Sequence, residues 1–175
     1  MLKRGEFAMA FFKASEIVGF AVRIEENGES FYKTLAQSAE NADVRDVLEF
    51  LASEERKHIM VFRKLLDAVG EYEPPVESYP GEYESYVKAL VDGHIFTKDK
   101  VGELMAKKVS SEMEAVEAGI SLEKDSIIFY NEMRNYVPKS EHSVIDKVID
   151  QEKDHLKRLV NIKTKLGGGN PLSSH

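Results

Sequence analysis

The sequence predicts an all-α fold, a four-helix bundle made of two helical hairpins joined by a long crossover that contains short helices. Three observations support this prediction. Apolar residues recur at helical spacing along four long stretches. The prolines fall near 74–80, at 138 and at 171, and so leave those stretches uninterrupted. The two hairpins also share one pattern of glutamate, Phe-Tyr and Glu-x-x-His, which indicates an internal repeat.

The first hairpin is expected to consist of helices over 14–39 and 44–69. A polar turn lies between them, and Asp43 is the expected N-cap of the second helix. Gly70 follows that helix and is a natural helix stop. The first helix carries an apolar stripe at helical spacing, made of Ile17, Phe20, Ala21, Ile24, Phe31 and Leu35.

The crossover is expected to cover residues 70–110. It begins with EYEPPVESYPGEY, whose prolines and glycine predict a loop. Two short helices are expected after this loop, near 82–95 and 98–108. A single long connection of this kind is what a bundle with one crossover requires.

The second hairpin is expected to consist of helices over 111–136 and 141–166. Pro138 separates them, and Ser140 is the expected cap of the last helix. Gly167, Gly168 and Gly169 then end it.

The chain of 175 residues is long enough for one domain with a sizeable core. A single domain is therefore predicted over 1–166, with hairpins at 14–69 and 111–166 and the connection at 70–110. Residues 167–175 are expected to form a flexible tail.

Composition excludes several classes of function. A net charge of −7 argues against a nucleic-acid partner, which would need a basic surface. No apolar run approaches the roughly 20 residues of a membrane span, and Glu6 and Lys13 interrupt the N-terminal stretch, so neither membrane insertion nor export is expected. The expected location is the cytoplasm. Because the chain has no cysteine, redox chemistry would need a bound metal or cofactor.

Each hairpin carries a glutamate on its first helix and a Glu-x-x-His pair on its second. Residues three apart share one face of a helix, so each pair can direct an oxygen and a nitrogen at one ion. In each hairpin, the glutamate of the first helix and that of the Glu-x-x-His pair lie about 13–16 residues from the turn. Because an α-helix rises 1.5 Å per residue, the two glutamates are expected at the same height along the hairpin. The six candidate metal ligands are Glu25, Glu55, His58, Glu123, Glu152 and His155.

This set of donors predicts a site for two metal ions. Carboxylates can bridge two ions, and imidazole favours iron, zinc or manganese over calcium or magnesium. The four carboxylates also offset the charge of two divalent ions. Two iron ions are expected, with manganese or zinc as possible occupants. A single Glu-x-x-His is ordinarily a solvated surface pair, whereas two copies with level partners favour a metal site.

Other residues near these ligands have narrower expected roles. Tyr32 and Tyr130 are expected to form hydrogen bonds with the metal-binding carboxylates. Gly28 leaves space one turn after Glu25, either for a small molecule such as O2 or peroxide or for close helix packing. Four glutamates are expected on exposed helix faces, namely Glu54, Glu112, Glu114 and Glu117. Asp154, His94, His142 and His175 are expected to lie away from the metals.

These residues resemble the rubrerythrin branch of the ferritin-like di-iron proteins. The resemblance covers roughly 14–68 and 111–166 and rests on the six candidate ligands and the Phe-Tyr pairs at 31–32 and 129–130. It implies a ferritin-like bundle with a non-haem di-iron centre that reduces peroxide or reacts with O2.

The resemblance also implies a role for each ligand. Glu55 and Glu152 would bridge the two metals, Glu25 and Glu123 would be terminal ligands, and each histidine would bind one metal. No catalytic residue beyond the metals is assigned. A homo-oligomer, as a dimer, is plausible in the family.

Two departures from the family pattern bear on function. Rubrerythrins usually carry a rubredoxin-like iron domain with four cysteines, so electrons would here come from a separate donor protein. Typical rubrerythrins also carry an additional glutamate where this chain has Ser126. The serine favours a ferroxidase, O2-reacting or iron-storage role over peroxide reduction. A structural bundle braced by zinc is a third alternative.

Overall fold

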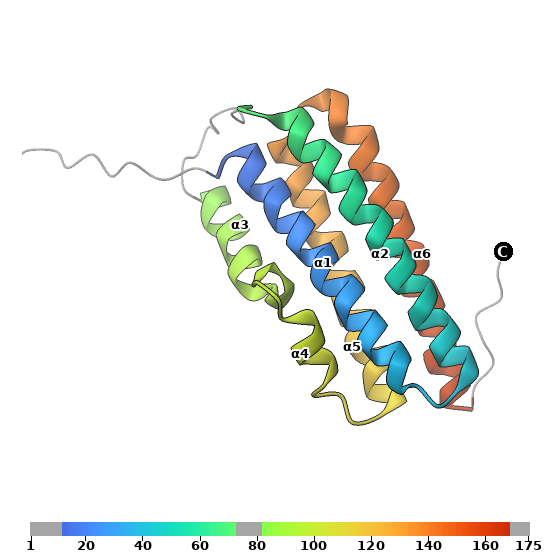
Figure 1. The fold of residues 1–175 in the computed structure, drawn as a ribbon. Helices are drawn as coiled ribbons and strands as arrows, with labels where there is room; N and C mark the ends of the chain where they lie inside the picture. The colour runs from blue at the N-terminus through green and yellow to red at the C-terminus, as the bar shows by residue number, and fades with distance from the viewer. Residues whose placement is uncertain (1–11, 73–81, 169–175) are drawn as a thin grey trace, which may run out of the picture.

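A computed structural model describes residues 12–72 and 82–168; for 82–84 and Ile95 it describes the backbone alone. Its four long helices pack side by side as two antiparallel pairs (Figure 1). This arrangement confirms the predicted all-α, ferritin-like bundle of two hairpins. The long helices are α1 (Ala14–Ser38), α2 (Ala42–Val69), α5 (Glu112–Met133) and α6 (His142–Leu166).

The crossover runs along the bundle beside α1 (Figure 1). Helix α2 ends at one end of the bundle and α5 begins at the other, so the connection must travel the whole length. It contains α3 (Glu82–Gly93), the 3-10 turn η1 (Ile95–Thr97) and α4 (Gly102–Ala106). The two predicted short helices are therefore present, although α4 is shorter than predicted. Most of the predicted loop before α3 lies outside the described residues.

Asn27 fastens the crossover to α1. Its buried side-chain amide donates hydrogen bonds to the carbonyl oxygens of Phe96 and Lys98, at 2.8 and 2.7 Å, and its oxygen accepts from the N–H of Gly102 at 3.0 Å. A Cβ on Gly102 would lie 2.0 Å from the Asn27 carbonyl oxygen, so only glycine allows this approach. The crossover is thus attached to α1 at a residue that lies two positions after Glu25.

Two predicted helix caps are wrong. Helix α2 begins earlier than predicted because the Asn41 side chain accepts a hydrogen bond from Val44 N–H at 3.2 Å, which makes Asn41 the N-cap. Asp43 lies inside the first turn, where its charge suits the helix N-terminus. Ser140 lies in the 3-10 turn η3 (Lys139–Glu141) and donates to the Glu141 carboxylate instead of capping α6.

The apolar stripe predicted on α1 faces the core, except that Phe20 is only partly buried. The C-terminal end of α2 also agrees with the prediction, since Gly70 adopts a φ of 47° at the cap. A further 3-10 turn, η2 (Arg134–Tyr136), ends the third long helix before Pro138. Within the described part of the chain, no helix has both the length and the apolar character needed to cross a bilayer.

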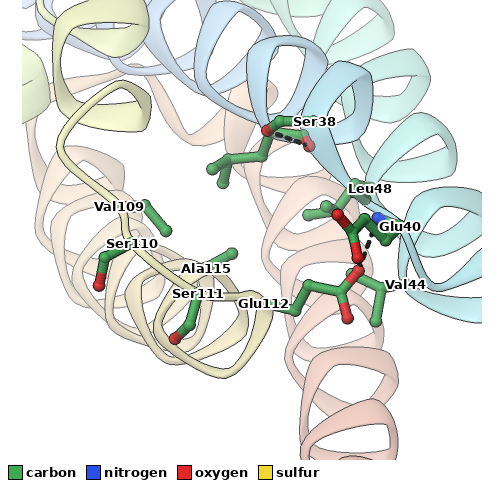
Figure 2. A pocket seen from close by; sticks show the side chains of 11 residues that line it. Ser38, Glu40, Val44, Leu48, Val109, Ser110, Ser111, Glu112 and Ala115 are labelled. Carbon is green, nitrogen blue, oxygen red and sulfur yellow. Dashed lines mark hydrogen bonds between the residues drawn. The ribbon is translucent and has the colours of Figure 1, made fainter.

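Glu112 connects the start of α5 to the α1–α2 turn. Its carboxylate accepts hydrogen bonds from the backbone N–H groups of Glu40 and Asn41, at 2.8 and 2.7 Å, as Figure 2 shows in part. Glu112 is therefore half-buried rather than on an exposed helix face as predicted. A pocket of about 370 Å³ opens beside this contact, with Leu35, Val44 and Val109 among its lining residues.

Candidate metal centre

The six predicted ligands meet inside the bundle, and each of the four long helices contributes to them. Because α1 supplies one carboxylate and α2 a carboxylate and an imidazole, with α5 and α6 repeating the arrangement, the site has the internal symmetry of the two hairpins. All six side chains are buried, with exposed fractions between 1% and 3%. They are Glu25, Glu55, His58, Glu123, Glu152 and His155.

The ligand atoms form two groups, in each of which they lie within 4.8 Å of one another. One group consists of Glu25, Glu55, His58 and Glu152, and the other of Glu55, Glu123, Glu152 and His155. Glu55 and Glu152 belong to both, as bridging carboxylates must. Each group therefore offers three carboxylates and one imidazole, and the two groups together form a buried site for two metal ions.

The distances around each histidine are short enough for a shared ion. Nδ1 of His58 lies 2.9 Å from Glu152 Oε1, 3.5 Å from Glu55 Oε2 and 3.6 Å from Glu25 Oε2. Nδ1 of His155 lies 3.0 Å from Glu152 Oε2 and 3.7 Å from Glu123 Oε2. Both imidazoles thus direct the same ring nitrogen at the carboxylates.

The donor set fits a pair of divalent cations. Both ring nitrogens of His58 and the Glu152 Oε1 atom are buried and have no aligned hydrogen-bond partner in the described residues. Buried polar atoms are rarely left unsatisfied, and a metal ion accepts lone pairs from imidazole and carboxylate alike. Four carboxylates and two imidazoles within this small volume match what two such ions require.

Burial and mutual repulsion make the metal-free carboxylates hard to ionise together. Burial, followed by the charges of Glu25 and Glu152, raises the pKa of Glu55 well above its ordinary value. Burial and the charge of Glu123 do the same for the pKa of Glu152. At Glu25, burial again opposes ionisation, but hydrogen bonding with Glu55 and the charge of His58 outweigh it, so its pKa is lowered.

The same carboxylates favour the protonated form of both histidines. Burial alone would lower the pKa of His58, but the charge of Glu25 and the contact with Glu152 raise it far more. The pKa of His155 is also raised, because Glu123 outweighs the effect of burial. Metal binding must therefore displace protons from this site.

Two tyrosines hydrogen-bond the carboxylates across the bundle. Tyr32 on α1 donates to Glu123 Oε1 on α5 at 2.5 Å, while Tyr130 on α5 donates to Glu25 Oε1 on α1. Each tyrosine therefore serves a carboxylate of the opposite hairpin, a crossing that the sequence spacing does not reveal. Burial and the adjacent carboxylate charges raise the pKa of both phenols, which stay protonated donors.

Gly28 lies against the side chain of Glu55. A Cβ added at this position would lie 3.4 Å from Glu55 Cγ and 3.5 Å from its Cδ. Of the two explanations for the glycine, close packing of α1 against α2 is therefore favoured over space for a small molecule. The α1 backbone at Gly28 therefore lies directly beside the Glu55 side chain, which leaves no empty space between them.

Phe50 covers the outer side of His155. Its ring, which is 36% exposed, stands perpendicular to the imidazole with the ring centroids 6.1 Å apart. The guanidinium of Arg158 lies 4.3 Å from the centroid of the same Phe50 ring. This aromatic and cationic cover limits solvent access to the ligand, and the sequence analysis did not predict it.

The described residues that were expected to lie away from the metals belong to neither ligand group, but Glu54, like Glu112, is less exposed than predicted. Glu54 is only 9% exposed, and its carboxylate pairs with the largely exposed Lys57. Glu117 lies on the surface and pairs with Lys163 at 2.8 Å. The other described members of that set also belong to neither group, while His175 lies outside the described residues.

The pocket beside Glu112 (Figure 2) is not the metal site. None of the six candidate ligands lines it, and its walls come from the α1–α2 turn and the segment leading into α5. The candidate metal site therefore lies in the packed interior between the four helices and not in this pocket.

Comparison with known proteins agrees with this geometry. The family model described as Rubrerythrin matches residues 16–163. A search of curated protein sequences finds no match. Among solved structures, the chain is similar to a putative ferritin-like diiron-carboxylate protein from Thermotoga maritima, with 29% identity and a TM-score of 0.65 over 87% of this chain and 95% of that one.

A second similar structure is a hypothetical protein from Pyrococcus furiosus. It is 20% identical, with a TM-score of 0.54, and the match covers 92% of this chain and 94% of that chain. At this identity the similarity concerns the fold alone. Both matches cover most of each chain.

Proposed function

The chain belongs to the rubrerythrin family, whose model matches residues 16–163, and on this premise we propose that it is a non-haem di-iron oxidoreductase. Its proposed reaction is the reduction of peroxide, or reaction with O2, with electrons from an external donor protein. The observation that carries the proposal is the pair of buried ligand groups sharing Glu55 and Glu152.

The donor types support iron as the metal. Imidazole together with several carboxylates suits iron and manganese, and one imidazole for each metal leaves room for exogenous oxygen ligands. When bound, two ferrous ions would supply the two electrons that, with two protons, convert one hydrogen peroxide into two waters. Every other part of the process depends on how the protein holds its ligands and excludes water.

The residues around the centre have roles that follow from their contacts. Tyr32 and Tyr130 hold the Glu123 and Glu25 carboxylates in place through hydrogen bonds from the opposite hairpin. Glu55 and Glu152 have raised pKa values in the metal-free site, so they release protons when a metal binds. Phe50 shields His155 from solvent.

Ser126 favours a second candidate function, that of a ferroxidase or an iron storage or detoxification protein of the ferritin type. This serine lies buried on α5, one turn after Glu123, where typical rubrerythrins carry an additional glutamate. A serine is neutral and cannot supply a further carboxylate to the metals. In this alternative, the centre would oxidise iron that is then stored in an oligomer.

The first test is an anaerobic Fe(II) titration of metal-free protein, with irons counted for each chain. Binding that saturates near two supports the di-iron centre, and peroxide consumption faster than that of free iron then supports the oxidoreductase. The variant Glu55→Gln should lose binding at both positions. Glu49→Gln, an exposed glutamate on the same helix, is the matched control and should bind as the parent does.

The same titration separates the alternatives. Uptake far beyond two irons after air is admitted, together with assembly into a large oligomer, would favour storage. A protein that takes up zinc and shows no reactivity with peroxide or O2 when loaded with iron would be a structural bundle. The proposed assembly for the oxidoreductase is a dimer, which sedimentation analysis would distinguish from a cage.

A further inference from the structure

The candidate metal site is closed to solvent on all sides. None of its six ligand side chains is more than 3% exposed. A metal ion that binds to the folded chain must therefore pass between two of the long helices, and it can do so only where a covering side chain moves aside. The packing of the four helices shows which interface offers such a side chain.

Close packing fills three of the four interfaces between neighbouring long helices. Between α1 and α2, the Gly28 backbone lies directly against the Glu55 side chain. Between α5 and α6, Gly119 approaches Leu159 so closely that an added Cβ would lie 3.2 Å from Leu159 Cδ1. The crossover packs against both α1 and α5 and so covers the interface between them (Figure 1). The interface between α2 and α6 remains.

A single layer of side chain separates a ligand from solvent at the α2–α6 interface. The imidazoles of His58 and His155 are stacked there, with ring centroids 5.5 Å apart and an interplanar angle of 23°. The Phe50 ring stands perpendicular to the outer side of His155, with the centroids 6.1 Å apart. Phe50 is 36% exposed whereas His155 is 2% exposed. The Phe50 ring is therefore the boundary between this ligand and the surrounding water.

The Phe50 ring is held from outside by a contact that is easily broken. The Arg158 guanidinium on α6 lies 4.3 Å from the ring centroid, and Arg158 is itself exposed. A cation–π contact at an exposed site is weak, and exposed side chains change rotamer within picoseconds to nanoseconds. Because Phe50 already faces solvent in part, its ring can turn outward without displacing the backbone of α2.

We propose that Phe50 is the gate of the metal centre. Its ring turns away from His155 to admit a metal ion between α2 and α6, and the Arg158 guanidinium holds the ring in its closed position. The inference rests on the proposed function only in so far as it requires the metal site, and it adds the route by which that site is filled and emptied.

A gate and a residue that positions a ligand change different quantities. A gate stabilises neither the metal-free nor the metal-bound state over the other, so its removal raises the rates of metal entry and release by the same factor and leaves Kd unchanged. A residue that orients His155 would change Kd. A surface charge that repels an incoming cation would change mainly the rate of entry. Measuring both rates together with Kd therefore distinguishes the three roles.

The first experiment measures how fast Zn(II) enters and leaves the protein. Metal-free protein is mixed with Zn(II), and excess chromophoric chelator added at increasing times captures the zinc that has not entered. Release is followed by transfer of zinc from loaded protein to the same chelator. We expect Phe50→Ala to raise both rates about tenfold and to leave Kd within a factor of two, because the burial of a phenyl ring no longer has to be undone at each passage.

Met60→Ala is the matched control for Phe50→Ala. Met60 is a 58% exposed apolar residue on the same helix and belongs to neither ligand group, so this variant should keep the parent rates. Rates in Phe50→Ala that equal those of the parent would overturn the proposal. A change in Kd greater than twofold would also overturn it, since Phe50 would then orient the ligand instead of gating access to it.

Arg158→Gln tests the same ring from the surface, without removing apolar packing. Loss of the cation–π contact, about 0.5–1 kcal/mol at an exposed site, should raise both rates about two- to fivefold with Kd unchanged. This variant also keeps the proposal falsifiable if Phe50→Ala does not fold. Faster entry with unchanged release would show that Arg158 only repels the cation and would overturn its role in holding the ring.

The outcomes also separate the gate from the proposed function. A parent protein that exchanges zinc through Phe50, but whose iron-loaded form consumes neither peroxide nor O2, would refute the oxidoreductase and leave the gate supported. Peroxide turnover by a protein whose zinc exchange does not depend on Phe50 would refute the gate alone. A parent protein that binds no metal would refute both.

Discussion

Tyr32 and Tyr130 link the two hairpins through two of the candidate ligand carboxylates. Each phenol is fully buried and donates a hydrogen bond to a glutamate on the first helix of the other hairpin. Gly119 on α5 lies so close to Tyr32 that an added Cβ would be 3.2 Å from the ring, which leaves the phenol little freedom. The hydrogen bonds therefore orient Glu123 and Glu25 before any metal binds.

Removing either phenolic hydroxyl should weaken metal binding while the fold persists. Tyr32→Phe and Tyr130→Phe keep the packed ring but leave the Glu123 or Glu25 carboxylate without its donor, and loss of such a contact typically lowers metal affinity 10–100-fold. Competition with a chromophoric chelator for Zn(II) measures the change. Tyr72→Phe, beyond the end of α2, is the control. Unchanged affinity in both buried variants would show that the hydrogen bonds do not orient the ligands.

The two ligand groups make different predictions for single-ligand variants. His58 belongs to one group only, so His58→Ala should leave about one metal bound to each chain, whereas Glu152→Ala should weaken both positions because Glu152 belongs to both. Zn(II) titration followed by calorimetry counts the sites. His142→Ala, outside both groups, is the matched control. If His58→Ala still binds two equivalents with parent affinity, the grouping is incorrect.

At the residue scale, the six clustered side chains were predictable because helical spacing and the position of each turn depend on local sequence. Their role as metal ligands stays a prediction for the titrations to test. Asn27 was not recognised, because its importance depends on contacts between the crossover and the bundle. The burial of Glu54 was missed for the same reason, since helical periodicity alone does not show which flank of α2 is covered.

At the element scale, Asn27 determines where the crossover lies. Its side chain satisfies three backbone groups of η1 and the segment leading into α4, and it stands two residues after Glu25. Two exposed ion pairs, Arg56 with Glu29 and Arg63 with Glu26, join α1 to α2 on the outside, where such pairs contribute little. Neither pair involves the crossover, which the buried Asn27 amide holds against α1.

Replacing Asn27 by alanine should destabilise the protein and loosen the crossover. The change leaves two carbonyl groups and one N–H group without partners, at a cost of about 3 kcal/mol. Urea denaturation measures the loss of stability, and hydrogen exchange should show faster exchange over 96–102 than in α5 and α6. Asn131→Ala, on the exposed face of α5, is the control. Uniform exchange across the chain would indicate that Asn27 does not act on the crossover specifically.

The elements themselves were predictable to different degrees. The four long helices follow from uninterrupted apolar periodicity and from prolines that fall only between them. The caps Asp43 and Ser140 were assigned incorrectly because Asn41 and Glu141 compete for the same local positions, and the choice depends on how each turn packs. The short α4 begins where Gly102 meets Asn27, a contact between residues far apart in sequence.

At the scale of the whole molecule, the metal-free bundle encloses four carboxylates and two histidines that favour a partly protonated state. The raised pKa values of Glu55 and Glu152 mean that the folded protein retains protons that the unfolded chain releases above about pH 4.3. Two divalent ions would replace these protons and neutralise the charge. The fold and the metals are therefore coupled through the same six residues.

The stability of metal-free protein should fall as pH rises from about 5 to 8, and metal should reverse this trend. The raised pKa values of Glu55 and Glu152 remove stability above the unfolded value of about 4.3, and those of His58 and His155 remove it above about 6.5. The lowered pKa of Glu25 adds stability that is already complete above about pH 4.5. The net slope over this range is therefore negative.

Thermal denaturation with chelator and with excess Zn(II), at pH 5.5, 6.5 and 7.5, tests this coupling. At a free metal concentration 1,000 times Kd, each ion contributes about 4 kcal/mol, which should raise Tm by about 10 °C or more at pH 7.5. The difference should shrink at pH 5.5, because protons compete for the ligands. Equal Tm values with and without chelator at pH 7.5 would mean that the six residues fold without needing a metal. A Tm of the metal-free protein that rises with pH would contradict the direction of the pKa shifts.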